Sequence, residues 1–206
     1  MARFLFVHGA WHGAWCFQLV VDALERRGHR AEAVDLPCDQ VGLTQDDYAA
    51  LVGPRPDTIV VAHSLGAQTV ALLEARRRVY LGGLLPVQDA APACFVPGFG
   101  GAVRDEQDRS YWPDADICAA RLYPDCTRPQ SDWAFAQLRP QARITSRAAP
   151  FGPGDVVIAT MRDAAIDPDW QIRTARAHGA RVIELDSGHS PFITQPDELA
   201  ELLSSL

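Results

Sequence analysis

Three side chains of this 206-residue chain could together attack a carbonyl carbon: Ser64, Asp163 and His189. A serine hydroxyl is a weak nucleophile until a histidine removes its proton, and a carboxylate that holds the imidazole completes the arrangement. Ser64 lies in the run IVVAHSLGA (59–67), where a β-branched stretch turns sharply into a helix-forming one. Such a turn exposes the hydroxyl at its apex. We therefore predict that Ser64 is the nucleophile, His189 the base and Asp163 the acid.

Two details of this triad need weighing. Ala62 stands where a glycine is usual, which is a mild departure because the crowded turn requires only a small residue there. Asp167 is a second acid close to the first. It precedes Pro168 at the expected start of a helix, where a carboxylate commonly caps the first amides. Capping explains Asp167, so Asp163 is the favoured partner of the histidine.

The negative oxygen that forms during acyl transfer needs backbone donors. The amide after the nucleophile, that of Leu65, and one from the loop after the first strand, that of Ala10, are in the expected places. Each such donor is typically worth about 10²–10³ in rate. Among the other histidines, we expect His8 to brace this loop and His63 to serve packing and hydrogen bonding.

Strand-like and helix-like runs alternate along the chain, which predicts an α/β fold with a parallel sheet covered on both faces. The expected strands are 4–7, 31–34, 58–61, 80–85, 156–160 and 181–185, and the expected helices are 15–27, 45–52, 65–76, 168–177 and 196–203. The arginines at 76–78 would end the third of these helices. All four groups with predicted catalytic roles follow strands, at the carboxyl end where ligands bind in such sheets.

Residues 86–150 interrupt this alternation within what is otherwise one domain over 1–206. The segment is rich in Pro, Gly, Asp and Arg, with helical stretches at 115–122 and 131–138. An insertion of this length between core strands is typical of a lid over an active site. We expect four aromatic or imidazole side chains to line the pocket: Trp11, His12, Trp112 and Trp133.

Composition excludes several other classes of protein. The net charge of −7 disfavours nucleic acid, and no apolar run approaches the roughly 20 residues of a membrane span. The chain starts directly on a strand-like run, so we expect no signal peptide. Its five cysteines show no paired spacing and are expected as free thiols in the cytoplasm. No cluster of residues offers a metal site.

The blocks FVHGAWHGAW (6–15), VAHSLG (61–66) and SGH (187–189) resemble the hydroxynitrile lyase and plant methylesterase branch of the α/β-hydrolase superfamily. LYPDC (122–126) and LRPQ (138–141) are similar to lids of bacterial members. The resemblance implies a six-stranded sheet, no cofactor and a small apolar pocket, and it leaves a homodimer open. Ser190 departs from the lyases of this branch, which carry a lysine directly after the catalytic histidine.

Hydrolysis of a small ester or thioester through an acyl-enzyme is the leading prediction. One alternative is a lyase or cyclase that uses the Ser64 and His189 pair for acid–base chemistry without acylation. Another is a binding protein that keeps the fold and uses the pocket for a ligand. A complete triad disfavours a pure receptor, because binding alone has no need of Asp163.

Overall fold

The computed structural model describes residues 1–88, 90, 93–145 and 148–206, and it confirms the predicted α/β-hydrolase architecture. A six-stranded sheet, parallel throughout, has the order β2-β1-β3-β4-β7-β8. Its strands are β1 (Arg3–Val7), β2 (Arg30–Val34), β3 (Arg55–His63), β4 (Ala75–Leu81), β7 (Val156–Thr160) and β8 (Arg181–Leu185). The central strands are apolar on both faces, as β7 shows with five consecutive buried residues.

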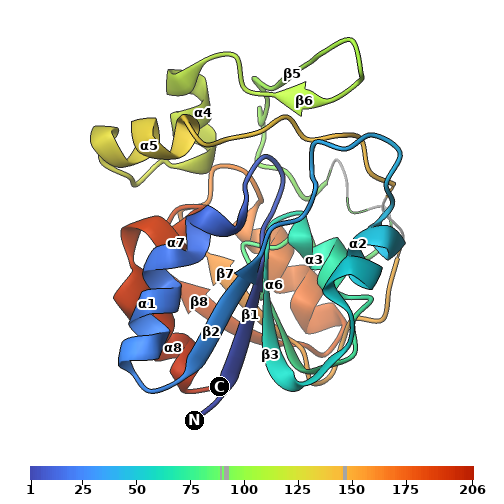
Figure 1. Cartoon of the computed structure of the whole chain (residues 1–206), viewed down its shortest axis with the longest axis vertical. Coiled ribbons are helices and arrows are strands. Elements are labelled where there is room, and N and C mark those ends of the chain that lie inside the picture. The colour runs from blue at the N-terminus through green and yellow to red at the C-terminus, as the bar shows by residue number, and fades with distance from the viewer. Residues whose placement is uncertain (89, 91–92, 146–147) are drawn as a thin grey trace.

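Helices cover both faces of the sheet (Figure 1). The helices of the sheet region are η1 (Ala14–Phe17), α1 (Gln18–Arg26), α2 (Gln45–Val52), α3 (Gly66–Val70), α6 (Pro168–Ala177), α7 (Pro191–Thr194) and α8 (Pro196–Ser204). In the view of Figure 1, α1, α7 and α8 lie on one side of the sheet, and α2, α3 and α6 lie on the other. No helix within the described residues has the length and apolar character to cross a membrane.

The helix after the nucleophile turn is shorter than predicted, and the next strand begins earlier. We expected a helix over 65–76 and a strand over 80–85, whereas α3 spans five residues and β4 already starts at position 75. The arginines at 76–78 therefore lie in a strand and do not end a helix. Arg78 shows why, because its Nε donates to the buried Asp155 carboxylate at 2.8 Å. Asp155 directly precedes β7, so this tertiary contact favours a strand at 76–78 and overrides the helix propensity of the three arginines.

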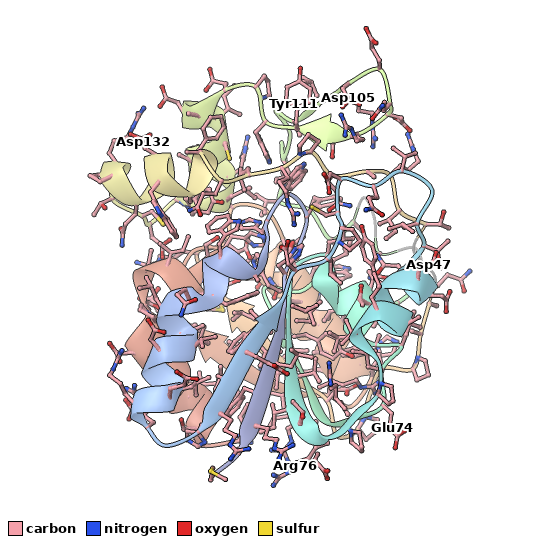
Figure 2. All side chains as sticks on the ribbon, in the orientation of Figure 1. Asp47, Glu74, Arg76, Asp105, Tyr111 and Asp132 are labelled. Carbon is pink, nitrogen blue, oxygen red and sulfur yellow. The ribbon has the colours of Figure 1, made fainter. Side chains whose placement is uncertain are left out.

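A cap from the 86–150 segment lies over the carboxyl ends of the strands (Figure 1). It contains β5 (Val103–Arg104), β6 (Ser110–Tyr111), α4 (Ala115–Leu122) and α5 (Arg128–Phe135). Helix α5 starts three residues before the predicted position because Thr127 and Gln130 form a capping box there. Figure 2 shows Asp105 and Tyr111 on this cap, at the end of the molecule opposite Arg76.

Candidate active site

Ser64 lies on a strained turn between β3 and α3. Its φ of 50° is in the left-handed region, which a residue with a side chain adopts only when its surroundings impose it. Two glycines make the turn possible. A Cβ at Gly66 would lie 2.6 Å from the carbonyl oxygen of His8, and one at Gly9 would lie 2.7 Å from the Cβ of Ser64. The turn is thus packed against the loop after β1, and any larger residue at either glycine would push the two apart.

Asp163 and His189 form a buried pair beyond the ends of β7 and β8. The Oδ2 atom of Asp163 lies 2.8 Å from Nδ1 of His189, and both side chains are almost completely buried. The carboxylate also accepts a hydrogen bond from Thr160 Oγ1 at 2.7 Å. Its second oxygen accepts the amides of Ala165 and Ile166 at 2.8 and 3.0 Å. Four donors fix the carboxylate, which in turn fixes the imidazole with its proton on Nδ1.

The rival acid has a different role. The side chain of Asp167 caps α6 by accepting the amide of Asp169 at 2.9 Å. The structure therefore pairs the histidine with Asp163, and it gives Asp167 the capping role that the neighbouring proline suggested.

Ser64 and His189 open onto one cavity of about 370 Å³, which lies under the cap. No hydrogen bond joins the serine hydroxyl to the imidazole within the described residues. Such bonds are often long before substrate binds and tighten in the reactive complex. The geometry supplies a hydroxyl, a carboxylate-held base and a space for substrate between them and the cap.

Ala10 and Leu65 line the same cavity. Leu65 is the N-cap residue of α3, where helix geometry leaves backbone amides without partners. Neither residue's amide donates to another group in the portion of the chain that the structure describes. Trp11, which follows the first of them, has a φ of 65° and is therefore a second strained position at this site. Both amides thus lack a backbone acceptor among the described residues, and both residues line the cavity that Ser64 enters.

Three further histidines are buried around this site, and burial lowers the pKa of each. The pKa of His12 falls to about 3, that of His63 falls well below its usual value, and that of His8 is also lowered. All three are therefore neutral at pH 7. His63 Nε2 lies 3.0 Å from the carbonyl oxygen of His189, to which it donates. It therefore supports the loop that carries His189.

The cavity is mainly apolar, with a few polar groups on the cap side. Its apolar lining comes from both the sheet ends and the cap: Trp11, Leu84, Phe95, Phe99, Leu122, Ala142, Ile144, Ala165 and Ile166. Its polar lining beyond the residues above comprises Arg104, Ser110, Gln141 and Arg143. Most of these lining residues were not predicted from the sequence. Ile166 could have been found, since it lies three residues after Asp163, and Leu84 could have been found because it follows the carboxyl end of β4, whereas Ile144 carries no such signal.

Of the four predicted pocket residues, Trp11 lines the cavity and the other three do not. His12 is fully buried behind it, with Nδ1 on the carbonyl oxygen of Ala10. Trp112 is buried in the cap, with its ring 5.3 Å from that of Trp11. Trp133 lies on the outside, 47% exposed. The reason is the same for each: an aromatic ring can fill cap or loop packing as well as a substrate pocket.

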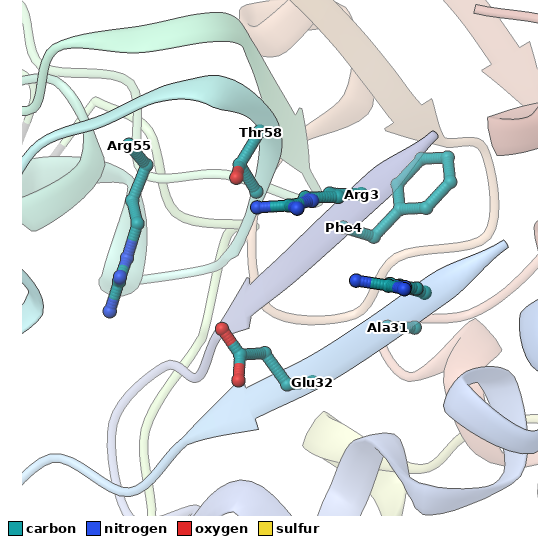
Figure 3. Close-up of a pocket in the computed structure, with 7 residues that line it drawn as sticks. Arg3, Phe4, Ala31, Glu32, Arg55 and Thr58 are labelled. Atoms are coloured by element: carbon teal, nitrogen blue, oxygen red, sulfur yellow. The ribbon is translucent and has the colours of Figure 1, made fainter. Parts of the chain in front are cut away.

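A second cavity, of about 260 Å³, lies at the amino ends of β1, β2 and β3 (Figure 3). Arg3, Arg30 and Arg55 line it together with Glu32 and Thr58. Ser64, Asp163 and His189 follow the carboxyl ends of their strands, so this cavity lies at the opposite end of the sheet from them.

The cysteines do not compete with Ser64 as nucleophiles. All five are free, and burial raises the pKa of each thiol, to about 11 for Cys38 and about 12 for Cys126. A thiol with so high a pKa is almost entirely protonated at pH 7 and therefore a poor nucleophile. Among the described residues, no three His, Cys, Asp or Glu side chains gather into a group that could hold a metal ion.

A fold of this topology, with a serine on a strand-to-helix turn, defines an α/β-hydrolase. Residues 4–202 match the model of the alpha/beta hydrolase family, and the chain belongs to that family. The resemblance to plant methylesterases that the sequence motifs indicated is confirmed.

Known relatives match over the full length of the chain. A carbendazim hydrolyzing esterase of Nocardioides sp. is 26% identical, with 100% of both chains covered. Methylesterase 10 of Arabidopsis thaliana is 24% identical, with 99% of this chain and 91% of the relative covered. The crystal structure of a pyrethroid hydrolase from Sphingobium faniae JZ-2 shares the fold, with a TM-score of 0.75, 19% identity, and coverage of 99% and 96%. The chain is an enzyme of the esterase and hydrolase class.

Proposed function

We propose that this enzyme hydrolyses a small ester or thioester through an acyl group carried on Ser64. The observation that supports this most directly is the buried pair of Asp163 and His189, whose Oδ2 and Nδ1 atoms are 2.8 Å apart. His189 lines the same cavity as Ser64, which lies on a strained turn. Strain of this kind persists only where surrounding structure enforces it, and it is concentrated at functional sites.

In the first half of the reaction, the Oγ of Ser64 attacks the carbonyl carbon and its proton passes to Nε2 of His189. The negative charge that develops on the carbonyl oxygen is stabilised by the amides of Ala10 and Leu65. Asp163 remains ionised and stabilises the imidazolium. The imidazolium then gives its proton to the departing alcohol or thiol, and the acyl group stays on Ser64.

In the second half, water takes the place of the alcohol. His189 accepts a proton from the water as its oxygen attacks the acyl carbon, and the same amides hold the second oxyanion. When the carbon–oxygen bond to Ser64 breaks, the imidazolium returns the proton to the serine. The products are a carboxylic acid and the regenerated enzyme.

The cavity indicates the size and polarity of the substrate. At about 370 Å³, with aliphatic and phenyl side chains over most of its lining, it suits a small and largely apolar ester. Two full-length relatives, a methylesterase and a carbendazim hydrolyzing esterase, are esterases by name, which supports an ester as the substrate.

Hydrolysis is favoured over cyanohydrin cleavage by the residue that follows His189. A lyase must stabilise a departing anion, and a cation beside the base does so by Coulomb attraction. Ser190 carries no charge, and its hydroxyl donates to the carbonyl oxygen of Leu122 at 2.8 Å. The leaving group is therefore one that His189 can protonate.

A fluorophosphonate probe tests this proposal, since it labels an activated serine. We expect labelling of wild type and of Ser131→Ala, a buried serine of the cap, and none of Ser64→Ala. Ser64→Ala should also lose about 10⁴–10⁶-fold in kcat on short p-nitrophenyl esters while circular dichroism shows an unchanged fold. Labelling that survives in Ser64→Ala would place the nucleophile elsewhere. Efficient cleavage of mandelonitrile without ester turnover would favour the lyase alternative.

A further inference from the structure

A four-residue segment of the cap, Leu122–Asp125, contacts both loops that carry catalytic groups. We propose that Tyr123 in this segment is a positioning residue, which acts through His12 to hold the carbonyl group of Ala10, on the side of that residue opposite to its oxyanion-hole amide. The inference rests on the proposed function, because it assigns Tyr123 a part in binding the oxyanion of acyl transfer.

Two short hydrogen bonds make the connection. The hydroxyl of Tyr123 lies 2.8 Å from Nε2 of His12, and Nδ1 of the same ring lies 2.8 Å from the carbonyl oxygen of Ala10. A carbonyl oxygen only accepts, so Nδ1 carries the proton. In a neutral ring Nε2 must then accept, and the tyrosine hydroxyl donates to it. The tautomer of His12 is thus fixed at both ends.

The surroundings keep this chain of bonds dry and neutral. His12 and Tyr123 are 1% and 2% exposed, and the rings of Trp15, His63 and Phe192 pack around the imidazole. Burial lowers the pKa of His12 to about 3 and raises that of Tyr123 well above its usual value. Hydrogen bonds shielded from water in this way are stronger than exposed ones, and each orients its neighbour.

The peptide groups on either side of Ala10 are held by two different imidazoles. On the amino side, His8 Nδ1 donates to the carbonyl oxygen of Gly9 at 2.9 Å, while its Nε2 accepts the amide of Leu36. That clamp belongs to the sheet region. On the carboxyl side, the clamp is His12, and its outer partner comes from the cap. Trp11, with its strained φ, follows Ala10 directly. Without the hydrogen bond from His12, this strain would favour a change in the backbone conformation of the loop.

The same cap segment also holds the loop of His189. The carbonyl oxygen of Leu122 accepts the hydroxyl of Ser190 at 2.8 Å, and Asp125 Oδ2 accepts the amide of Gly188 at 2.7 Å. A Cβ at Gly188 would lie 2.4 Å from Asp125 Oδ1, so the contact requires a glycine. One segment of the cap therefore contacts both the His12 side chain behind the oxyanion-hole loop and the loop of the base.

Tyr123→Phe tests the role of the hydroxyl, and Tyr80→Phe is its matched control. Tyr80 is also fully buried, but its hydroxyl has no partner among the residues described, and it lies in β4 outside the site. Deletion of a whole oxyanion donor costs about 10²–10³, and misplacing one should cost less. We expect kcat of Tyr123→Phe to fall about tenfold or more, with KM changed less than threefold.

A transition-state analogue separates positioning from general damage. A trifluoromethyl ketone, whose oxygen becomes an oxyanion when Ser64 adds to it, should bind Tyr123→Phe more weakly by the same factor as kcat/KM. Tyr80→Phe should match wild type in kcat and in analogue affinity. The proposal is overturned if Tyr123→Phe keeps kcat within twofold of wild type, or if analogue affinity is unchanged while kcat falls.

Histidine ¹⁵N resonances test the connection without any assay of activity. In wild type, His12 should be the neutral tautomer protonated on Nδ1. In Tyr123→Phe, where Nε2 loses its donor, its ¹⁵N shift should move, and in Tyr80→Phe it should not. A wild-type ring protonated on Nε2 would overturn the connection. If wild type shows the Nδ1 tautomer but turns over no ester, the proposed function fails and the link between the cap and His12 stands.

Discussion

The sheet region and the cap contribute to one active site, but they are held together by different forces. At the ends of the strands, Asp163 is buried and takes four hydrogen bonds, two of them from backbone amides of its own loop. In the cap, many charged contacts lie in water, as between Arg143 and Asp108 or Arg128 and Asp116. Exposed pairs of that kind contribute about 0–1 kcal/mol each. The buried residues of the cap, such as Leu122 and Tyr123, therefore stabilise it more than these exposed pairs do.

This difference separates three kinds of position. In the proposed mechanism, polar groups at the strand ends carry the reaction, and changes there should act on kcat. Buried residues where the cap meets the sheet region, such as His12, align the groups and support the fold. Residues on the outer side of the cap, such as Trp133, should affect neither. Three measurements test this division.

The largest effect is expected for Asp163→Asn. Because Asp163 Oδ1 accepts two backbone amides, the asparagine carbonyl must take that place and its NH₂ must face His189 Nδ1. The imidazole is then protonated on Nε2 and cannot accept the serine proton. We expect kcat for p-nitrophenyl butyrate to fall about 10⁴-fold, as for a triad with the wrong tautomer.

Asp167→Asn is the control for that change. Asparagine caps a helix about as well as aspartate, so α6 should be unaffected and kcat should stay within threefold of wild type. A larger loss for Asp167→Asn than for Asp163→Asn would mean that Asp167 is the acid partner of His189. The buried Asp163–His189 pair would then not be part of the reaction.

The same division explains what could be predicted from the sequence. Ser64 and His189 follow strands, and a parallel sheet brings the carboxyl ends of its strands together, so order along the chain was enough to bring them to one cavity. The extent of α3 was not predictable, because the buried partner of Arg78 is 77 residues away. The role of Trp133 was not predictable either, since ring type does not tell which side of a cap faces the cavity.

The second measurement is the dependence of stability on pH, which reports on the junction between cap and sheet region. Burial lowers the pKa of His12 to about 3, whereas its unfolded value is near 6.5. The unfolded chain therefore binds a proton that the folded chain does not, and stability falls as pH drops below about 6.5. For this group alone, about 1.5–2 kcal/mol should be lost between pH 6.5 and 5.

Urea unfolding at several pH values measures this slope. The lowered pKa values of His8 and His63 add to it with the same sign. In His12→Gln, which is expected to be less stable at pH 7, the slope near pH 5.5 should be shallower by about one proton. An unchanged slope would mean that His12 is protonated equally in the folded and the unfolded state. Water would then reach His12 between the cap and the sheet region.

The smallest effects separate the inner and outer sides of the cap. Phe99 lines the cavity, with its ring stacked 5.0 Å from that of Phe95, so Phe99→Ala removes apolar surface that substrate would cover. Half the burial of a phenyl ring is worth about 1–1.5 kcal/mol, which predicts a rise in KM of about tenfold for a butyrate ester and less for an acetate.

Trp133 is 47% exposed and packs on Trp15 outside the cavity, so Trp133→Ala should leave kcat and KM within twofold of wild type. A strong and acyl-dependent change of KM in Trp133→Ala, with Phe99→Ala silent, would reverse the two sides of the cap.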